Sequence, residues 1–265
     1  MTISIGVDVG GSGIKVAAVD LAGGGKLAST RLRVVTPIPS TPDAVIRVIA
    51  RLVKRTATAA KAPDAPVGAG VPCVVLEGTT MTAANLDKSW IGFPAVDAMS
   101  KAVRRRVSVG NDADVAGLAE MRFGLGATDP NTRKGVVIFL TLGTGVGSAV
   151  FNDGVLVPNT ELGHMEIRGR DAERRSAAAA RIRRGISWKA WSQDLDEHLQ
   201  AIDRLFWPRM IILGGGVSKQ ADRFIPRLTC RPPVLAATLR NEAGIVGAAL
   251  LAAEEDVRKE LDPDL

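Results

Sequence analysis

The chain has 265 residues, of which 46% are hydrophobic and 23% are charged. These proportions exclude an intrinsically disordered protein, which combines low hydrophobicity with high net charge. The sequence contains no uninterrupted apolar stretch of about 18 residues and no signal-peptide pattern, so we expect no membrane segment. With only two cysteines, a disulfide framework is excluded, and we expect a cytoplasmic protein.

The net charge is +6, which suits an anionic partner such as a phosphate compound. Aromatic residues make up 4% of the chain, and tyrosine is absent. Because single-stranded nucleic acids are bound largely by stacking on aromatic side chains, we expect no nucleic-acid partner.

Strands and helices are mixed along the first half of the chain. The first three predicted strands are joined by glycine-rich turns, which indicates an antiparallel meander. Thr41 and Pro42 fit the N-cap and the first position of the first helix. The predicted strands cover residues 3–9, 15–20, 27–36, 67–71 and 107–110. The predicted helices cover residues 41–61, 94–105 and 113–123.

The same pattern restarts in the second half. Val9–Ser12 aligns with Leu142–Gly145, and Asp20 aligns with Asp153. The shared order of strand, glycine turn and strand indicates two similar half-folds of the α/β class. The predicted strands cover residues 136–142, 148–152, 210–213 and 234–238. The predicted helices cover residues 186–206, 219–228 and 242–258.

Glycine turns follow three of the apolar strands. Glycine lets the backbone approach a ligand closely, and its N–H groups can bind an anion. Ser12 and Thr144 add hydroxyl groups, and Lys15 can neutralise a phosphate. The alternative for any single turn is a tight hairpin without a ligand. None of the turns is a Walker A motif or a convincing dinucleotide fingerprint. The turns are Gly10–Gly13, Gly143–Gly147 and Gly214–Gly216.

Two carboxylates lie next to predicted strands. Asp8 precedes the first glycine turn, and we expect it to orient Mg²⁺ through water; the alternative is capping of the turn N–H groups. Asp112 follows strand 107–110 at its carboxyl end, where active sites of α/β sheets collect. It is a candidate general base for an alcohol in phosphoryl transfer, with helix capping as the alternative.

Glu161 and His164 form another polar cluster. A carboxylate and an imidazole can together bind neighbouring sugar hydroxyls, and Asn85 adds a candidate amide. A turn residue is the alternative for Asn85, and a surface histidine without a ligand is the alternative for His164. We interpret His198, inside the predicted helix 186–206, as a surface histidine without a ligand.

Five motifs, taken in their order along the chain, resemble those of the ROK family of sugar kinases, and the resemblance covers nearly the whole chain. The resemblance implies an α/β fold of the actin-like ATPase type, in which duplicated ribonuclease-H-like sheets form two lobes around a central cleft. It implies an N-terminal lobe of residues 1–110, on which helix 242–258 packs, and a C-terminal lobe of residues 111–241. The motifs are Asp8–Ser12, Gly110–Ala113, Leu140–Gly147, Glu161–His164 and Leu213–Val217.

The resemblance also implies roles for individual residues, with Asp112 as the catalytic base. The sugar-binding residues expected from it and from the cluster above are Asn85, Asn111, Asp112, Glu161, His164 and Glu173. The expected phosphate-binding residues are Asp8, Gly10, Gly11, Ser12, Gly13, Lys15, Thr141, Gly143, Thr144 and Gly145. The residues expected beside a nucleotide are Gly214, Gly215 and Gly216.

One segment departs from the family pattern. Typical members follow the histidine with a cysteine-rich zinc motif that ends in a sugar-binding glutamate, whereas residues 165–180 contain no cysteine. We therefore expect no zinc, and Glu173 is the candidate replacement for that glutamate. The arginine-rich segment resembles the polyphosphate-dependent glucokinase branch of the family, in which we expect Lys15, Arg168, Arg170 and Arg174 to guide the polymer.

The implied reaction is phosphoryl transfer from inorganic polyphosphate or ATP to the 6-hydroxyl of glucose, and also of mannose, with Mg²⁺. A homodimer is compatible with the resemblance. One alternative is a hexose or N-acetylhexosamine kinase that uses ATP only. Another is a sugar-sensing regulator, which requires a helix-turn-helix ahead of the kinase-like lobes; we do not expect one, because the chain begins with the strand that contains Asp8.

Overall fold

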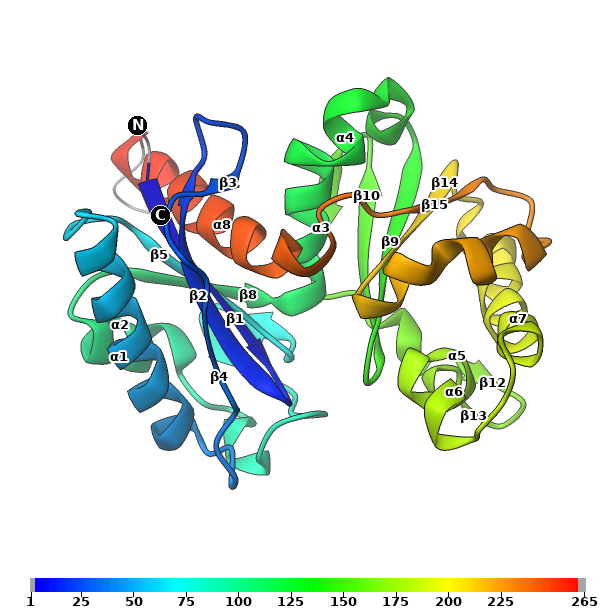
Figure 1. Cartoon of the computed structure of the whole chain (residues 1–265), viewed down its shortest axis with the longest axis horizontal. Helices are drawn as coiled ribbons and strands as arrows, with labels where there is room; N and C mark the ends of the chain where they lie inside the picture. Colours follow the sequence, from blue (N-terminus) through cyan, green and yellow to red (C-terminus); the bar gives the residue numbers. More distant parts are fainter. Residues whose placement is uncertain (1–2, 262–265) are drawn as a thin grey trace. The chain divides into compact units, whose positions relative to one another are not determined.

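The computed structural model describes residues 3–261, which form two compact units. The first unit contains residues 3–119 and 242–261, and the second contains residues 120–241. The chain passes from the first unit to the second inside helix α3 (Asp112–Phe123), whereas the sequence placed the division near Gly110. In the first unit, the C-terminal helix α8 (Ala243–Leu261) packs against the N-terminal sheet (Figure 1).

The sheet of the first unit has the strand order β3-β2-β1-β5-β8, and β4 also pairs with β2. Strand β1 is antiparallel to β2 and parallel to β5, which is in turn parallel to β8. The single strand predicted over 27–36 is wrong. Two short strands form instead, because the hydroxyl oxygen of Ser29 accepts the Ala18 N–H and interrupts the ladder. The strands are β1 (Ile3–Gly10), β2 (Gly13–Asp20), β3 (Lys26–Leu27), β4 (Leu32–Val34), β5 (Val67–Val71) and β8 (Val107–Asn111).

The sheet of the second unit repeats this arrangement. Its strand order is β11-β10-β9-β14-β15, with an antiparallel β9–β10–β11 meander followed by the parallel strands β14 and β15. The repeated strand–turn–strand pattern of the sequence therefore corresponds to two sheets of the same topology. The strands are β9 (Val136–Leu142), β10 (Val146–Asn152), β11 (Val155–Val157), β14 (Met210–Gly214) and β15 (Val234–Ala236).

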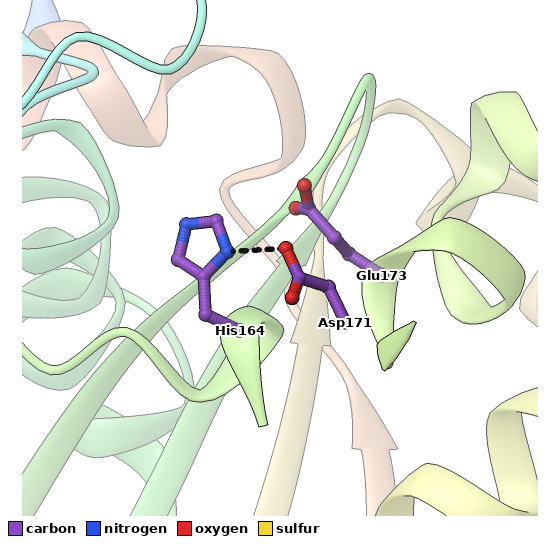
Figure 2. Close-up of side chains that lie close together, drawn as sticks. All are labelled: His164, Asp171 and Glu173. Carbon is purple, nitrogen blue, oxygen red and sulfur yellow. Dashed lines mark hydrogen bonds and ion pairs between the residues drawn. The ribbon is translucent and has the colours of Figure 1, made fainter. Parts of the chain in front are cut away.

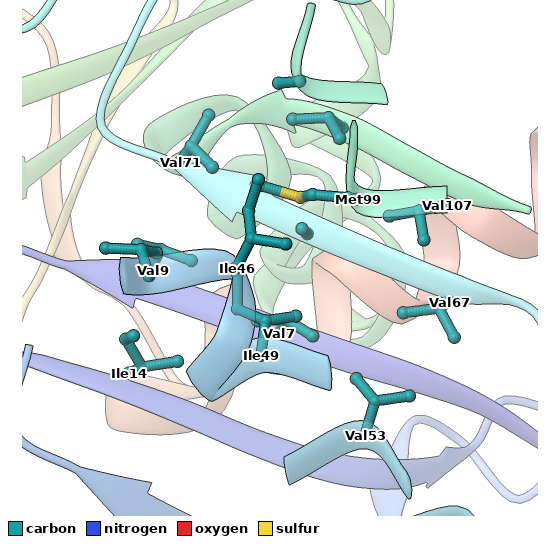
Figure 3. Packing of buried hydrophobic residues seen from close by; sticks show 14 of the residues in the cluster. Val7, Val9, Ile14, Ile46, Ile49, Val53, Val67, Val71, Met99 and Val107 are labelled. Carbon is teal, nitrogen blue, oxygen red and sulfur yellow. The ribbon is translucent and has the colours of Figure 1, made fainter. Parts of the chain in front are cut away.

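One face of the first sheet is aliphatic. Helices α1 (Pro42–Ala59) and α2 (Ala95–Val103) cover it, and Figure 3 shows Ile46 and Ile49 of α1 and Met99 of α2 packed over the strand valines. Helix α1 starts after Thr41 with proline at its first turn, as predicted. Burial of these branched side chains away from water supplies the main stabilisation of this layer.

The opposite face of the same sheet is built from glycines. A Cβ atom on Gly6 would overlap the carbonyl oxygen of Ile245 in α8, and one on Gly68 would overlap that of Ala248. Helix α8 therefore lies with its backbone directly on the strand backbones. A residue with any side chain at Gly6 or Gly68 would separate the helix from the sheet.

The second unit contains one long helix and, later in the chain, two 3₁₀ turns. Helix α7 (Trp188–Phe206) begins at the N-cap Ser187, whose hydroxyl oxygen accepts the Ala190 N–H. The α-helix predicted over 219–228 is wrong. The segment forms the 3₁₀ turns η4 (Gly216–Arg223) and η5 (Ile225–Arg227), because Gln220 has non-helical dihedral angles and Pro226 supplies no N–H.

The remaining elements are short and were not predicted. In the first unit they are β6 (Val75–Leu76), β7 (Thr79–Thr80) and η1 (Lys88–Trp90). In the second unit they are α4 (Leu125–Thr128), η2 (Pro130–Arg133), η3 (Leu162–His164), β12 (Glu166–Ile167), β13 (Arg170–Asp171), α5 (Glu173–Ser176) and α6 (Ala178–Arg183). The turn η6 (Arg240–Glu242) spans the return of the chain to the first unit. None of the described helices is long and apolar enough to span a lipid bilayer.

Candidate active site

The first unit places its candidate residues along the carboxyl edge of the parallel strands. Asp8 lies opposite Gly70 in the β1–β5 register, and Gly70 lies opposite Gly110 in the β5–β8 register. A Cβ atom on Gly70 would come within 3.4 Å of the Asp112 Cα atom, so the glycine leaves space for the start of α3. Asp8 and Gly110 are therefore at equivalent positions on strands β1 and β8, which are two strand spacings, roughly 10 Å, apart.

Asp8 is paired with Lys15. The two residues face each other across β1 and β2, and Lys15 Nζ donates to Asp8 Oδ2 over 2.6 Å. The Asp8 side chain keeps 16% of its surface exposed. Lys15 is therefore the ion-pair partner of Asp8, not a lone ammonium. A partly exposed carboxylate suits the water-mediated Mg²⁺ contact expected for Asp8.

The helix cap beside Asp112 is formed by Asn111. Its side-chain oxygen accepts the N–H groups of Ala113 over 2.8 Å and of Asp114 over 3.2 Å, and its Nδ2 donates to the Cys73 carbonyl. The side chain of Asn111 is buried. The capping role considered for Asp112 thus belongs to Asn111, which holds Asp112 at the first position of α3.

The first glycine turn connects β1 to β2, and Gly11 and Ser12 at its tip are exposed. The loop that contains Asn85 lies against this turn, because a Cβ atom on Gly11 would come within 3.2 Å of the Asn85 carbonyl oxygen. The structure therefore brings Asn85 beside the predicted phosphate loop. Within the first unit, the candidate residues are Asp8, Gly10, Gly11, Ser12, Gly13, Lys15, Asn85, Asn111 and Asp112.

The second unit brings the two other glycine turns together. Gly215 has a positive φ of 81°, and a Cβ atom there would come within 2.8 Å of the Leu142 backbone nitrogen. Leu142 ends strand β9 and precedes the turn that contains Gly143 and Thr144, both of which are exposed. Thr141 and Gly214 are paired in the β9–β14 register. The predicted phosphate and nucleotide glycines thus share one edge of the second sheet.

Glu161 precedes the short turn η3, and His164 is its last residue. Ser148 of β10 anchors this turn, because its hydroxyl oxygen accepts the Leu162 N–H over 2.9 Å. Burial raises the pKa of Glu161, the positive charge of nearby His164 lowers it, and Glu173 raises it further. The structure therefore places Glu161, His164 and Glu173 close enough to influence one another's charge.

Asp171 is a member of this cluster that the sequence analysis missed. Its Oδ2 lies 3.0 Å from His164 Nδ1 (Figure 2), and this hydrogen bond is the main reason that the pKa of His164 is raised. The contact depends on the β12–β13 hairpin, in which Arg168 and Gly169 both have positive φ, as in a type I′ turn. Because the usual Asn-Gly signature is absent, the hairpin was not recognised.

Glu173 supports the second glycine turn. Its Oε2 accepts the Val146 N–H over 2.9 Å, and a side chain at Gly145 would collide with the same oxygen. His164, Asp171 and Glu173 offer three ligand atoms within 4.8 Å of one another, and this group contains no cysteine. The Nδ1 atom of His164 and Oε2 of Glu173 are both already engaged in hydrogen bonds. The proposed sugar-binding role of Glu173 stays a prediction.

We expect Asp171→Asn to lower the pKa of His164 toward about 6.5, because the variant loses the charged hydrogen-bond acceptor. The raised pKa also means that the ion pair stabilises the fold fully below about pH 6.5 and that this contribution is lost as the pH rises through the folded-state pKa. An NMR titration of the His164 and His198 imidazoles, in the unmodified protein and in the variant, measures the change in the pKa of His164. The pKa of buried His198, which burial lowers, serves as the internal reference. An unchanged His164 titration in the variant would contradict this assignment.

The model of the ROK family matches residues 4–181, which is more than half of the chain. The chain belongs to the ROK family. A polyphosphate glucokinase of Mycobacterium tuberculosis is 45% identical over 246 residues, covering 92% of this chain and 89% of that protein. Both the family resemblance and the ROK-type α/β fold of actin-like ATPases expected from the sequence are thereby confirmed.

Two solved structures have folds similar to that of this chain. The inorganic polyphosphate/ATP-glucomannokinase from Arthrobacter sp. strain KM is 46% identical, with a TM-score of 0.91 over 96% of this chain and 100% of that chain. A ROK glucokinase from Streptomyces griseus, solved with glucose and AMPPNP, is 25% identical, with a TM-score of 0.77 over 95% of this chain and 99% of that chain.

Proposed function

We propose that this ROK protein transfers a phosphoryl group from inorganic polyphosphate or ATP to the 6-hydroxyl of glucose, and also of mannose. The observation that carries the proposal is its 46% identity, over 96% of the chain, to a polyphosphate/ATP-glucomannokinase of the same fold. The positions of the candidate residues at the carboxyl edges of both sheets support the same activity.

In this proposal the first unit supplies the base. Asp112, held at the start of α3 by the Asn111 cap, accepts the proton of the 6-hydroxyl as the oxygen bonds to the terminal phosphorus. The bond from that phosphorus to the bridging oxygen breaks, which leaves a shortened polyphosphate or ADP. Asp8 would contact, through water, a Mg²⁺ ion bound with the donor, and this ion would neutralise phosphate charge.

The second unit supplies ligands for the sugar and the donor. Glu161 and His164 bind sugar hydroxyls, and the Asp171 hydrogen bond fixes the orientation of the His164 ring. The Gly143–Gly145 turn, in which Gly143 and Thr144 are exposed, binds phosphate, and Gly214–Gly216 lie beside the adenosine when ATP is the donor. We further infer that the two units act as the two lobes of the kinase, that the enzyme is cytoplasmic, and that it can form a homodimer.

The structure changes which arginines are candidates for the polymer. Arg168 forms an ion pair with Glu197 over 2.8 Å. Arg170 and Arg174 are exposed and have no ion-pair partner among residues 3–256, whose side chains the structure describes. Polyphosphate has no base or ribose, so its recognition is largely electrostatic. Arg170 and Arg174 are therefore the side chains that we assign to it.

We expect turnover with both donors, and a stronger salt dependence with polyphosphate. Its KM is expected to rise roughly tenfold or more between 50 and 200 mM salt, as for about three phosphate contacts, whereas the KM for ATP changes less. Initial rates with each donor across this salt range provide the measurement. Absence of turnover with polyphosphate would leave an ATP-only sugar kinase.

The double variant Arg170→Gln, Arg174→Gln tests the assigned arginines. It is expected to raise the KM for polyphosphate and flatten its salt dependence, with the KM for glucose unchanged. The double variant Arg51→Gln, Arg55→Gln, which removes two exposed arginines from α1, is the matched control for the loss of charge. Equal effects of the two variants would show that only net charge matters.

A further inference from the structure

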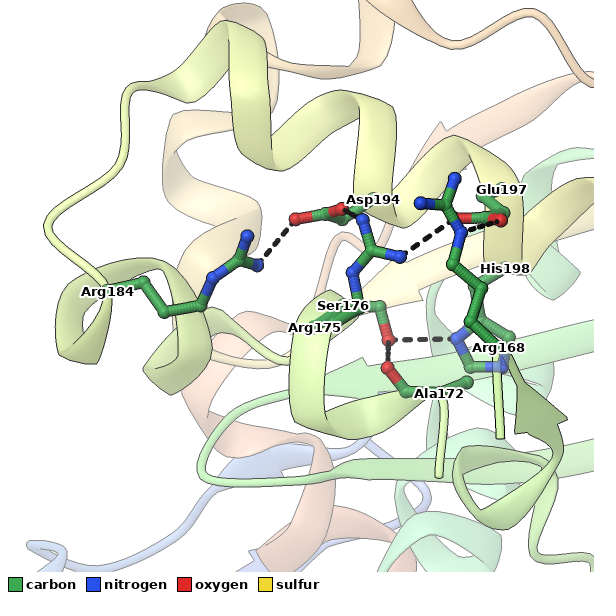
Figure 4. Close-up of polar contacts among 8 residues, drawn as sticks. All are labelled: Arg168, Ala172, Arg175, Ser176, Arg184, Asp194, Glu197 and His198. Carbon is green, nitrogen blue, oxygen red and sulfur yellow. Dashed lines mark hydrogen bonds and ion pairs between the residues drawn. The ribbon is translucent and has the colours of Figure 1, made fainter. Parts of the chain in front are cut away.

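Three polar residues on one face of α7 hold the cysteine-free segment of the second unit. Asp194, Glu197 and His198 are spaced three and four residues apart, so they project from the same side of the helix. Figure 4 shows the contacts that they make with Arg168, Arg175, Ser176 and Arg184. The face therefore contacts residues within the cysteine-free segment 165–180 and Arg184 just after it.

The two acids bind this segment through arginines. Arg175 pairs with both Asp194 and Glu197, while Arg184 donates to Asp194 over 2.6 Å and Arg168 donates to Glu197 over 2.8 Å. The Asp194 side chain is only 6% exposed, so removing its partners would leave a buried charge. These pairs attach the segment to α7.

His198 makes two different contacts from inside the unit. It is 1% exposed, so the surface position expected from the sequence is wrong. Its Nε2 lies 3.0 Å from the Leu162 carbonyl oxygen, and its Nδ1 lies 2.9 Å from the Ser176 hydroxyl oxygen. A carbonyl can only accept, so Nε2 carries the proton. In the neutral ring Nδ1 then accepts from the Ser176 hydroxyl, whose single proton is also within reach of the Ala172 carbonyl oxygen at 3.0 Å. Burial lowers the pKa of His198, which favours this neutral form.

The two partners of His198 belong to the two segments of the candidate sugar site. Leu162 lies between Glu161 and His164 in η3. Ser176 ends α5, the helix that begins with Glu173 and that reaches the second glycine turn through the Glu173–Val146 hydrogen bond. One buried imidazole therefore connects both segments. Because hydrogen bonds weaken outside a narrow range of distance, these two contacts restrict the movement of one segment relative to the other.

We propose that His198 is a positioning residue for the sugar site, which fixes the η3 turn and helix α5 relative to each other so that Glu161, His164 and Glu173 keep one geometry. The inference rests on the proposed function, because that function assigns the sugar hydroxyls to Glu161 and His164, while Glu173 supports the neighbouring glycine turn. His198 touches neither the sugar nor the phosphoryl donor, and it acts through Leu162 and Ser176.

The test begins with His198→Phe, which keeps an aromatic ring in the buried position and removes both hydrogen bonds. We expect the KM and the calorimetric Kd for glucose to rise about tenfold or more, with kcat and the KM for polyphosphate changed much less. We also expect faster hydrogen exchange in peptides that cover residues 161–177 of the protein without substrate. His198→Gln, whose amide can donate to the Leu162 carbonyl, should restore part of the glucose affinity.

Leu199→Val is the matched control, because Leu199 is buried in the same helix and contacts the core instead. The control should lower the Tm while leaving the glucose KM unchanged. The proposal is overturned if His198→Phe has normal glucose affinity and normal exchange, or if Leu199→Val raises the glucose KM equally at an equal loss of Tm. If the unmodified protein does not bind glucose, the proposed function fails, and the exchange comparison still decides whether His198 connects the two segments.

Discussion

Asp112→Asn is expected to lower kcat about 10²- to 10⁴-fold, the usual contribution of general-base catalysis, with much less change in the Kd for glucose. An amide of the same shape can still hydrogen-bond the 6-hydroxyl, but it cannot accept its proton. Steady-state rates with both donors, combined with calorimetric glucose binding, separate the two effects. Near-normal turnover would assign the base to another residue.

The fold should survive this substitution, because Asn111 accepts the N–H groups of Ala113 and Asp114 at the start of α3 and asparagine keeps the shape of Asp112. Asp43→Asn is a suitable control, since Asp43 is an exposed acid in the first turn of α1. The control removes the same charge from the start of another helix. It is expected to leave kcat unchanged, and both variants should retain the Tm of the unmodified protein to within a few degrees.

Gly6→Ala is expected to reduce the free energy of unfolding of the first unit by about 3 kcal/mol, the upper end of the range for overpacking. The added methyl group would overlap the Ile245 carbonyl oxygen, which is main-chain and cannot rotate away. Helix α8 would have to move off the sheet. Because the protein has two units, denaturant unfolding should be followed by hydrogen exchange of α8 and β1 peptides, which reports on the first unit alone.

Gly10→Ala provides the matched control in the same strand. A Cβ atom on Gly10 has its nearest neighbour, the Gly13 carbonyl oxygen, at 3.4 Å, which is an ordinary contact. Alanine also reduces the entropy of the unfolded chain, so this variant should be neutral or slightly stabilised. Equal losses of stability in the two variants would show that strand glycines matter for a reason other than the close approach of α8.

The parts of the fold that the sequence predicted correctly are those with local signals. The apolar run and the glycines around residues 3–13 specify a strand and a turn, and the repeat at residues 136–147 specifies the equivalent pair in the second unit. Thr41 and Pro42 likewise mark a helix start without tertiary information. In each of these cases the signal lies within a few residues of the element.

The contacts that were missed join residues far apart in the sequence. Arg168 and Glu197 are 29 residues apart, and Arg175 and Asp194 are 19 apart, so no local spacing indicates either pair. His198 looked like a surface residue because its buried state depends on the packing of α5 and η3. Glu120 is a similar case: this buried carboxylate accepts N–H groups of Leu125, Thr238 and Leu239, which only the folded unit brings together.

The glycine face of the first sheet has a consequence for synthesis of the chain on the ribosome. Strand β1 emerges first, but the helix that covers its glycine face is the last described element to be made. All residues of the second unit are continuous and emerge before that helix. The second unit can therefore fold first, reversing the usual N-to-C order of domain folding, while the N-terminal strands wait with one face uncovered and need protection from aggregation.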